Sequence, residues 1–183
     1  AVTPQNTPIV SDVPPLLFGN KPTDGGNLLL NRNEYEDLIT NEPQSEKLLK
    51  KVLGADEFIN GIERWCLWLV DVNENELKKS PLVFERVQAV KDFRMRSPKA
   101  STKKKANTPH LFDENRHPQS GEYILVPSVS SERRLYVPLG IFDSNVVSTN
   151  RNYIIPNGTL YEFGVLSSLM HNDWMRLVTG RLD

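Results

Sequence analysis

The sequence predicts an α+β domain in which helices pack on a mainly antiparallel sheet. Three observations favour this fold class. Residues 65–70, WCLWLV, form a continuous apolar run rich in large side chains, which is typical of a buried strand. Shorter extended runs occur at 123–126 and within 145–155. Two stretches, which follow Ser80 and Thr159, repeat apolar residues at helical spacing.

Residues 1–17 are expected to form a linker or an extended arm. Four prolines exclude a helix there, and few core-forming residues accompany them. We expect residues 18–183 to form a single domain, since this length suffices for a sizeable core. The chain starts without methionine and stops just past a predicted helix, so we also expect it to be a fragment of a larger protein.

A turn and two helices are predicted before the buried strand. The turn at 22–26 lacks the GxxxxGK(S/T) spacing of a phosphate-binding loop, so a plain turn is the better interpretation. Helices are predicted at 33–40 and 43–53, because Pro43 suits a first-turn position and Gly54 a C-terminal stop.

A third helix is predicted after Ser80, a natural N-cap that is followed by proline. Val83, Val87 and Val90 give it an apolar stripe. From 97 to 120 the chain is polar and basic without sustained periodicity, which predicts a long, mobile loop.

The sequence also predicts a long C-terminal amphipathic helix. Residues 159–162 form a capping-box pattern at its start, and Gly180 ends it. Its buried stripe is expected to consist of Leu160, Phe163, Leu166, Met170, Trp174 and Leu177.

Charge is distributed unevenly along the chain, although the formal net charge is only −1. Residues 1–63 hold ten acidic and five basic side chains, whereas residues 84–134 hold eleven basic and six acidic ones. This asymmetry favours one face for a polyanion and another for solvent or a neighbouring domain.

Several function classes are excluded or disfavoured. No apolar run approaches the ~18 residues of a membrane span, and the lone Cys66 excludes an internal disulfide and fits a cytoplasmic protein. His110 and His117 lie outside the common zinc spacings and are better explained as exposed titrating groups than as metal ligands. Cys66 is expected to be buried and inert, and Ser167 lies within a helix rather than at a hydrolase elbow.

The segment 126–140, VPSVSSERRLYVPLG, is the most informative part of the chain. Two extended runs, 123–126 and 135–139, are predicted to flank a turn that carries hydroxyls, a carboxylate and two guanidiniums. A guanidinium can donate to guanine O6 and N7 together, and a carboxylate can accept from cytosine N4, each pair contributing about 1–3 kcal/mol of discrimination.

This segment resembles the target-recognition region of MmeI-type (Type IIL) enzymes. The resemblance extends to FGNKPTDGGNLLL (18–30), GADEFINGIERWCLWL (54–69), VQAVKDFRMRS (87–97) and FGVLSSLMHNDWMRLVTGRL (163–182), which follow in the family's order. These bacterial enzymes fuse an adenine-N6 DNA methyltransferase to sequence recognition and often to a nuclease. The resemblance implies a module that recognises a specific double-stranded DNA sequence.

The resemblance does not extend to catalytic motifs. The glycine-rich S-adenosylmethionine motif, the Asn/Asp-Pro-Pro-Tyr/Phe motif for a flipped adenine and the nuclease signature do not occur in the sequence. We therefore expect no catalysis by this fragment. A methyltransferase domain of the same parent chain would bind S-adenosylmethionine and methylate the adenine.

Candidate DNA ligands fall into two groups. Flexible ammonium groups in a basic loop, together with one arginine, are the phosphate candidates, on charge alone: Lys99, Lys103, Lys104, Lys105 and Arg116. Base-reading or framework candidates are Arg94, Arg96, Ser97, Ser130, Ser131, Glu132, Arg133 and Arg134.

Two alternatives stay open. Glu132 and an arginine of the turn could pair and only order a hairpin. Because this block belongs to the family's shared scaffold, phosphate or framework duty for Arg133 and Arg134 is at least as consistent with the sequence as base readout. For the whole domain, the alternative is a non-catalytic interaction or scaffolding module whose acidic N-terminal third docks on a partner.

Overall fold

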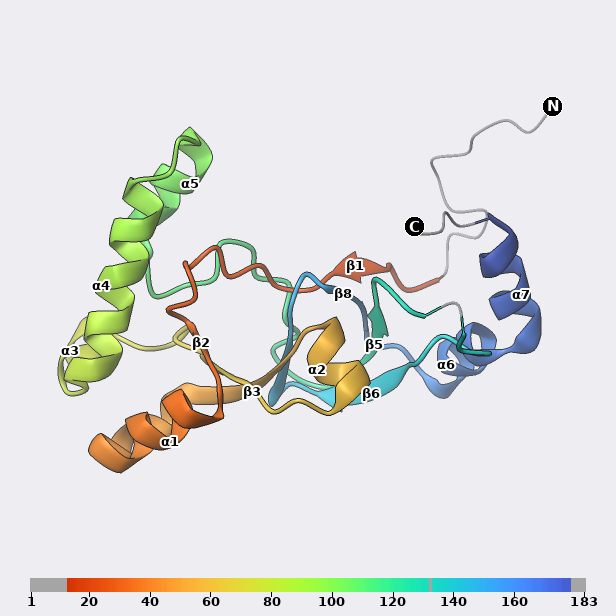
Figure 1. Cartoon of the computed structure of the whole chain (residues 1–183), viewed down its shortest axis with the longest axis horizontal. Coiled ribbons are helices and arrows are strands. Elements are labelled where there is room, and N and C mark those ends of the chain that lie inside the picture. The colour runs from red at the N-terminus through yellow and green to blue at the C-terminus, as the bar shows by residue number, and fades with distance from the viewer. Residues whose placement is uncertain (1–12, 132, 179–183) are drawn as a thin grey trace.

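The computed structural model describes residues 13–131 and 133–178. They form an elongated molecule with sheets in the middle and helices at both ends (Figure 1). The predicted α+β class is confirmed. Most of the predicted arm, residues 1–12, lies outside the described residues, and Leu17, at the end of that arm, already belongs to the first strand.

Two four-stranded sheets form the centre of the molecule. The first is antiparallel throughout, in the order β1 (Leu17–Phe18), β8 (Asn152–Pro156), β5 (Glu122–Pro127), β6 (Gly140–Asp143). The second follows the order β2 (Leu29–Leu30), β4 (Trp65–Leu67), β3 (Leu49–Leu53), β7 (Val146–Ser148), and only its β3–β7 pair is parallel.

The chain passes from the second sheet to the first where β7 leads into β8, and we call this connection the crossing point. The side chain of Asn152 donates to the carbonyl of Leu53 at 2.9 Å, and the side chain of Asn20 donates to the carbonyl of Ser148 at 2.8 Å. Gly19 lies so close that a Cβ atom there would fall 2.2 Å from the carbonyl oxygen of Thr149. The close approach fixes the backbone of the 149–152 turn, which matters for the site below.

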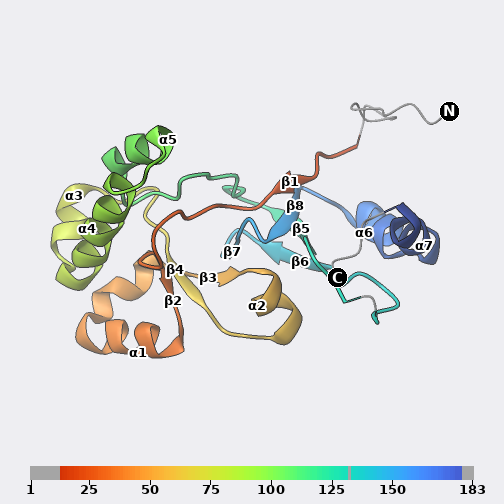
Figure 2. The same cartoon turned by 45° about the horizontal axis from the view of Figure 1, so that its top comes forward.

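Helices cover the two ends of the molecule (Figure 2). One end carries α3 (Glu74–Lys78), α4 (Pro81–Met95) and α5 (Ala100–Lys104), with the 3-10 helix η2 (Lys105–Asn107) following α5. The other end carries α6 (Leu160–Ser167) and α7 (Leu169–Val178). The remaining helical segments are α1 (Arg32–Asn41), the 3-10 helix η1 (Pro43–Leu48) and α2 (Ala55–Asn60).

The larger core lies between the second sheet and α4. Val83, Val87 and Val90 of α4 are buried there, as their helical spacing predicts, together with Cys66. Burial of the Cys66 thiol raises its pKa to about 12, so at neutral pH it is a protonated, poorly nucleophilic thiol. A smaller cluster under the first sheet contains Tyr123, Leu125 and Ile154.

Part of the predicted second helix is a strand. Residues 43–48 do form a helical segment, a 3-10 helix that begins at Pro43, but Leu49–Leu53 is strand β3. This strand pairs with β4 on one side and with β7, about a hundred residues away in sequence, on the other. A local helical pattern carries no information about such long-range pairing, and here the pairing determines that residues 49–53 form a strand.

The predicted mobile loop at 97–120 contains ordered helix. Residues 100–107 form α5 and η2, and the carbonyls of Lys105, Thr108 and Leu111 each accept a hydrogen bond from the Arg94 side chain. The order therefore comes from a buried arginine on the preceding helix rather than from apolar periodicity within the segment.

The second strand predicted beside the SSERR turn does not form. β5 matches the prediction, but residues 135–139 are irregular and the next strand, β6, starts at Gly140. The amide of Val137 donates to the Asn172 side chain at 2.7 Å instead of to a neighbouring strand. The connection from β5 to β6 is thus a loop of residues 128–139, which we call the β5–β6 loop.

The C-terminal helical segment is divided in two, and its apolar stripe is largely exposed. Ser168, between α6 and α7, has an extended backbone with φ −65° and ψ 149°. Four members of the predicted buried stripe are more than half exposed: Leu160, Met170, Trp174 and Leu177. The expectation of a buried stripe is wrong because no described element covers this side of α6 and α7.

Candidate nucleic-acid interface

The lysines predicted to contact phosphates are mostly available. Lys99, Lys103 and Lys104 are exposed on or beside α5, and their side chains have no partner among the described residues. Lys105 differs, because its ammonium donates to the carbonyl of Asp113 at 2.7 Å and lies 3.8 Å from the carboxylate of the same residue. Three of the four predicted lysines therefore offer free ammonium groups.

Arg116 is partly engaged within the protein. Its guanidinium forms an ion pair with Glu114 and donates to the carbonyl of Gly19 at 3.3 Å, while its backbone amide donates to Asn20 at 2.7 Å. These contacts hold the segment around Arg116 against Gly19 and Asn20, next to the crossing point of the two sheets. The geometry assigns Arg116 a framework role before any DNA contact.

Arg94, predicted as a base-reading or framework residue, is buried, with no exposed surface. It donates five hydrogen bonds to backbone carbonyls: those of Pro22, Thr23, Lys105, Thr108 and Leu111, at 2.8 to 3.0 Å. Burial lowers the pKa of this guanidinium, and the carboxylates of Asp113 and Asp24 oppose the shift. Its donors are all used, so the framework alternative fits and direct DNA contact does not.

Arg96 and Ser97 follow Arg94 at the end of α4. Arg96 is exposed, without a side-chain partner in the part of the chain that the structure describes. The hydroxyl of Ser97 accepts from the amide of Lys99 at 3.2 Å and so helps to start α5. Arg96 adds a fourth free cation to the α5 lysines, whereas Ser97 has a local structural role.

The β5–β6 loop carries the candidates of the SSERR block. Ser130, Ser131, Arg133 and Arg134 are exposed, and Glu132 lies outside the described residues. The amide of Arg134 donates to the carbonyl of Ser131 at 3.0 Å, which forms a tight turn. Arg133 and Arg134 lie in a loop rather than on a strand, so the alternation of side chains between the two faces of a sheet does not apply to them, and both are exposed.

Helix α7 holds the far side of the β5–β6 loop. The Arg176 guanidinium donates to the carbonyls of Arg134 and Leu135, both at 2.5 Å. Asn172, only 3% exposed, accepts from the amide of Val137 and donates to the carbonyls of Leu166 and Ser168. The buried side chain of Asn172 thus joins the loop to the break between α6 and α7.

Arg151 is a further candidate that sequence reasoning missed. It is exposed in the 149–152 turn and has no side-chain partner among the described residues. Its carbonyl accepts from both the amide and the hydroxyl of Ser128, at 3.1 and 2.6 Å, so the turn and the start of the β5–β6 loop are tied together. The signal was available, since a polar Thr-Asn-Arg-Asn turn separates two predicted strands.

An open hollow of about 520 Å³ lies beside Arg151. Ser128, Asn150 and Arg64 also line it, as do the first residues of α2. Arg64 is paired with Glu57 at 2.9 Å, so Arg151 is the unpaired cation at this hollow, which the carboxylate of Asp56 also lines. The hollow is therefore of mixed charge, and the free guanidinium of Arg151 at its edge is its candidate DNA-binding group.

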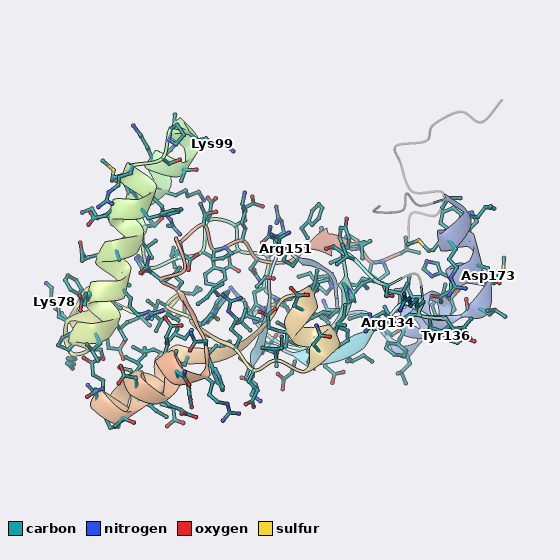
Figure 3. The ribbon with its side chains drawn as sticks, viewed as in Figure 1. Lys78, Lys99, Arg134, Tyr136, Arg151 and Asp173 are labelled. Carbon is teal, nitrogen blue, oxygen red and sulfur yellow. The ribbon has the colours of Figure 1, made fainter. Side chains whose placement is uncertain are left out.

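The candidate cations are spread along the long axis of the molecule. Lys99 lies at the α5 end, Arg151 near the middle and Arg134 near α6 and α7 (Figure 3). The structure therefore does not gather the predicted residues into one compact site. It offers a free-cation group at the α5 end and an arginine group, Arg133, Arg134 and Arg151, that lies between the middle of the molecule and α6 and α7.

Two further classes of site find no support within residues 13–131 and 133–178. No group of three His, Cys, Asp or Glu side chains lies together as metal ligands. His117, expected to be exposed, is half-buried, and its Nε2 lies 2.8 Å from the carbonyl of Ser144; burial lowers its pKa. Among these residues, no helix has the length and apolarity to cross a bilayer.

Three comparisons show which known proteins this chain resembles. Residues 1–183 match the family described as "MmeI, target recognition domain". The chain is 42% identical over 173 residues to "DNA methyltransferase A" of Bacillus subtilis (strain 168), a match that covers 94% of this chain and 20% of that protein. A solved structure of the Type IIL restriction-modification enzyme MmeI in complex with DNA matches with a TM-score of 0.91 and 46% identity, covering 97% of this chain and 24% of that one. The chain thus spans a fifth to a quarter of the length of these relatives.

Proposed function

This chain belongs to the family of MmeI target recognition domains, and we propose on that premise that it selects the DNA sequence on which a larger bacterial enzyme acts. The proposal takes double-stranded DNA as the ligand, since the similar MmeI structure is a complex with DNA. The domain contributes binding and sequence selection, and a separate part of the parent chain contributes the chemistry.

The observation that carries the proposal is the set of free arginines on fixed backbone. Arg133 and Arg134 are exposed in a loop that α7 holds by three hydrogen bonds, and Arg151 is exposed on a turn tied to the start of that loop. A guanidinium that donates two hydrogen bonds to one guanine discriminates only if the backbone behind it is positioned, because the paired geometry is narrow. These three arginines are therefore the proposed base-reading residues.

Phosphate contacts are assigned to the opposite end of the molecule. Lys99, Lys103 and Lys104, with Arg96, present free cations on and beside α5. Flexible ammonium groups suit a phosphate backbone, which carries charge but little directional information. In this proposal the α5 end contributes affinity and register, and the arginine group contributes sequence selection.

The parent protein is proposed to be an S-adenosylmethionine-dependent DNA methyltransferase of adenine N6. The relative from Bacillus subtilis is a DNA methyltransferase, and the remaining four-fifths of a chain of that length leave room for the catalytic domain. That domain would hold S-adenosylmethionine and extrude the adenine from the duplex. The same proposal places the protein in the bacterial cytoplasm, where the chromosome lies.

Selection from a pool of random duplexes tests the proposal. The chain is incubated with the pool at low and near-physiological salt, and the retained duplexes are sequenced. Enrichment of one short sequence that contains an adenine is the expected result. Retention without enrichment would contradict sequence recognition while leaving phosphate binding in place. If neither occurs, the same selection with the full-length parent distinguishes a domain that needs its neighbour from one that does not bind DNA.

A further inference from the structure

Helices α6 and α7 present an apolar face to the outside of the molecule. On α7, Met170, Trp174 and Leu177 are 86%, 59% and 84% exposed, and they recur at the spacing of a single helical stripe. Leu160 and Tyr161 at the start of α6 are 77% and 74% exposed. Val165, Leu169 and Val178 extend the face. Contiguous apolar surface of this kind marks an interaction site rather than scattered surface residues.

The opposite face of α7 is the one that packs on the domain, and it carries two polar side chains beside the half-buried Met175. Asn172 and Arg176 lie one helical turn apart and hold the β5–β6 loop through hydrogen bonds to Val137, Arg134 and Leu135. A surface helix of a self-sufficient domain has the reverse arrangement, with its apolar stripe inside. The orientation of α7 therefore leaves its apolar stripe available to a second body.

The charges on α7 argue against DNA as that second body. Arg176 is the only Lys or Arg within 169–178; it lies 3.7 Å from the carboxylate of Asp173, and its other nitrogen is used by loop carbonyls. A phosphate backbone requires free cations, and burying apolar side chains against it gains little. The covering surface must itself be apolar.

We propose that the exposed apolar face of α6 and α7 is the seam against the remainder of a longer parent polypeptide, which covers it with an apolar surface of its own. This rests on the proposed function in one respect, that the chain is a domain of a longer methyltransferase. The lengths favour this occupant: the matched segment is 20% of the Bacillus relative and 24% of the MmeI chain, so most of each relative lies outside it. The earlier alternative placed docking on the acidic N-terminal third, whereas the structure places the apolar surface at α6 and α7.

Helix α7 connects the seam to the β5–β6 loop. Its outer stripe meets the rest of the parent, and its inner stripe fixes the carbonyls of Arg134 and Leu135. Contact with the parent would therefore set the position of α7, and through it the position of the β5–β6 loop relative to the catalytic domain.

Methionine oxidation in the full-length parent, without DNA, tests the seam. Dilute hydrogen peroxide converts Met to its sulfoxide at a rate that follows exposure, and peptide mass spectrometry resolves each position. Met95, at the end of α4 and 53% exposed, is the internal control for Met170, which is 86% exposed in this chain. The seam predicts that Met170 is oxidised at least ~10-fold more slowly than Met95 in the parent.

Three outcomes would overturn the proposal. Met170 oxidised as fast as Met95 would mean that no part of the parent covers the face. Protection that disappears when the parent is diluted to a monomer would assign the face to a second copy. Protection that appears only after a DNA duplex is added would assign it to DNA. Duplex binding is measured on the same samples, so loss of the seam is distinguished from loss of DNA recognition.

Discussion

The five hydrogen bonds of Arg94 join the turn at 22–23, the end of α5 and the segment up to Leu111. Each carbonyl left without its donor in the interior costs about 1–3 kcal/mol. We expect Arg94→Met to lower the free energy of unfolding by at least ~3 kcal/mol, measured by urea denaturation. Arg94→Lys should recover only part of this, because an ammonium cannot reach all five acceptors.

Arg96 is the matched control for Arg94. It lies two residues further on, is exposed and has no side-chain partner among the described residues. Arg96→Met should change the unfolding free energy by no more than ~0.5 kcal/mol. Equal urea midpoints for the Arg94 and Arg96 variants would contradict the framework role of Arg94.

Arg151 is expected to read a base edge. On the preferred duplex, Arg151→Ala should weaken binding by about 5- to 150-fold, which corresponds to 1–3 kcal/mol. Arg151→Lys keeps the charge but loses the forked pair of donors, so it should retain binding to unrelated duplexes and lose preference at one base pair. Fluorescence anisotropy on matched duplexes that differ at single positions measures both. A lysine variant with unchanged sequence preference would show that Arg151 contacts phosphate only.

At the scale of elements, the β5–β6 loop depends on Asn172 of α7. Asn172→Ala removes the acceptor for the Val137 amide and the donor to Ser168, and should lower the unfolding free energy by about 1–3 kcal/mol. Hydrogen exchange should accelerate at the Val137 amide. Asn172→Asp keeps the acceptor, so it should preserve protection at Val137. Met170→Ala, on the exposed side of the same helix, is the control, and an equal acceleration there would contradict the link.

Helix α5 is the element predicted to contact phosphates. Changing Lys99, Lys103 and Lys104 together to Ala should weaken binding to every duplex by a similar factor and flatten its salt dependence. Each lost phosphate contact should reduce the log–log slope by about 0.9. The charge-matched control changes three other exposed lysines, Lys47, Lys51 and Lys79. The same slope for both triple variants would exclude α5 as the phosphate-binding element.

Elements with a strong local signal were predictable from the sequence. The helix after Ser80, the capping box at Thr159 and strand β5 all form where their patterns place them. The predictions are wrong where contacts between distant residues determine the secondary structure. Segment β3 is a strand because it pairs with β7, and α5 is ordered because the Arg94 side chain donates to the carbonyl at its end. The apolar residues of α7 do form a stripe, but no element among the described residues packs against it, so burial could not follow from periodicity alone.

Among site residues, the sequence identified side-chain types but not their partners. Charge patterning pointed to both the α5 lysines and the SSERR arginines. It could not show that Arg94 and Lys105 use their donors internally, since those acceptors are backbone carbonyls that any residue supplies. Arg151 was missed because a single arginine in a turn has no charge cluster around it.

At the scale of the whole molecule, the free cations are spread along its long axis, with Lys99 at the α5 end, Arg151 near the middle and Arg134 near α6 and α7 (Figure 3). Phosphate contacts at the α5 end and base contacts in the arginine group would let one duplex lie along the domain. The near-neutral formal charge of −1 is compatible with this, because the acidic excess of residues 1–63 offsets the basic excess of residues 84–134. Selection of a DNA sequence would then be a property of the whole domain. Moving the domain into another enzyme would move the selected sequence with it.

A domain exchange tests this central claim most directly. Residues 1–183 replace the matching segment of the Bacillus subtilis DNA methyltransferase, with which they share 42% identity over 173 residues. The modified positions in genomic DNA are then mapped by sequencing, next to those of both parent enzymes. We predict that the chimera modifies the sequence selected by the parent of this chain. Modification of the Bacillus enzyme's original target by the chimera would contradict the claim that this domain selects the sequence.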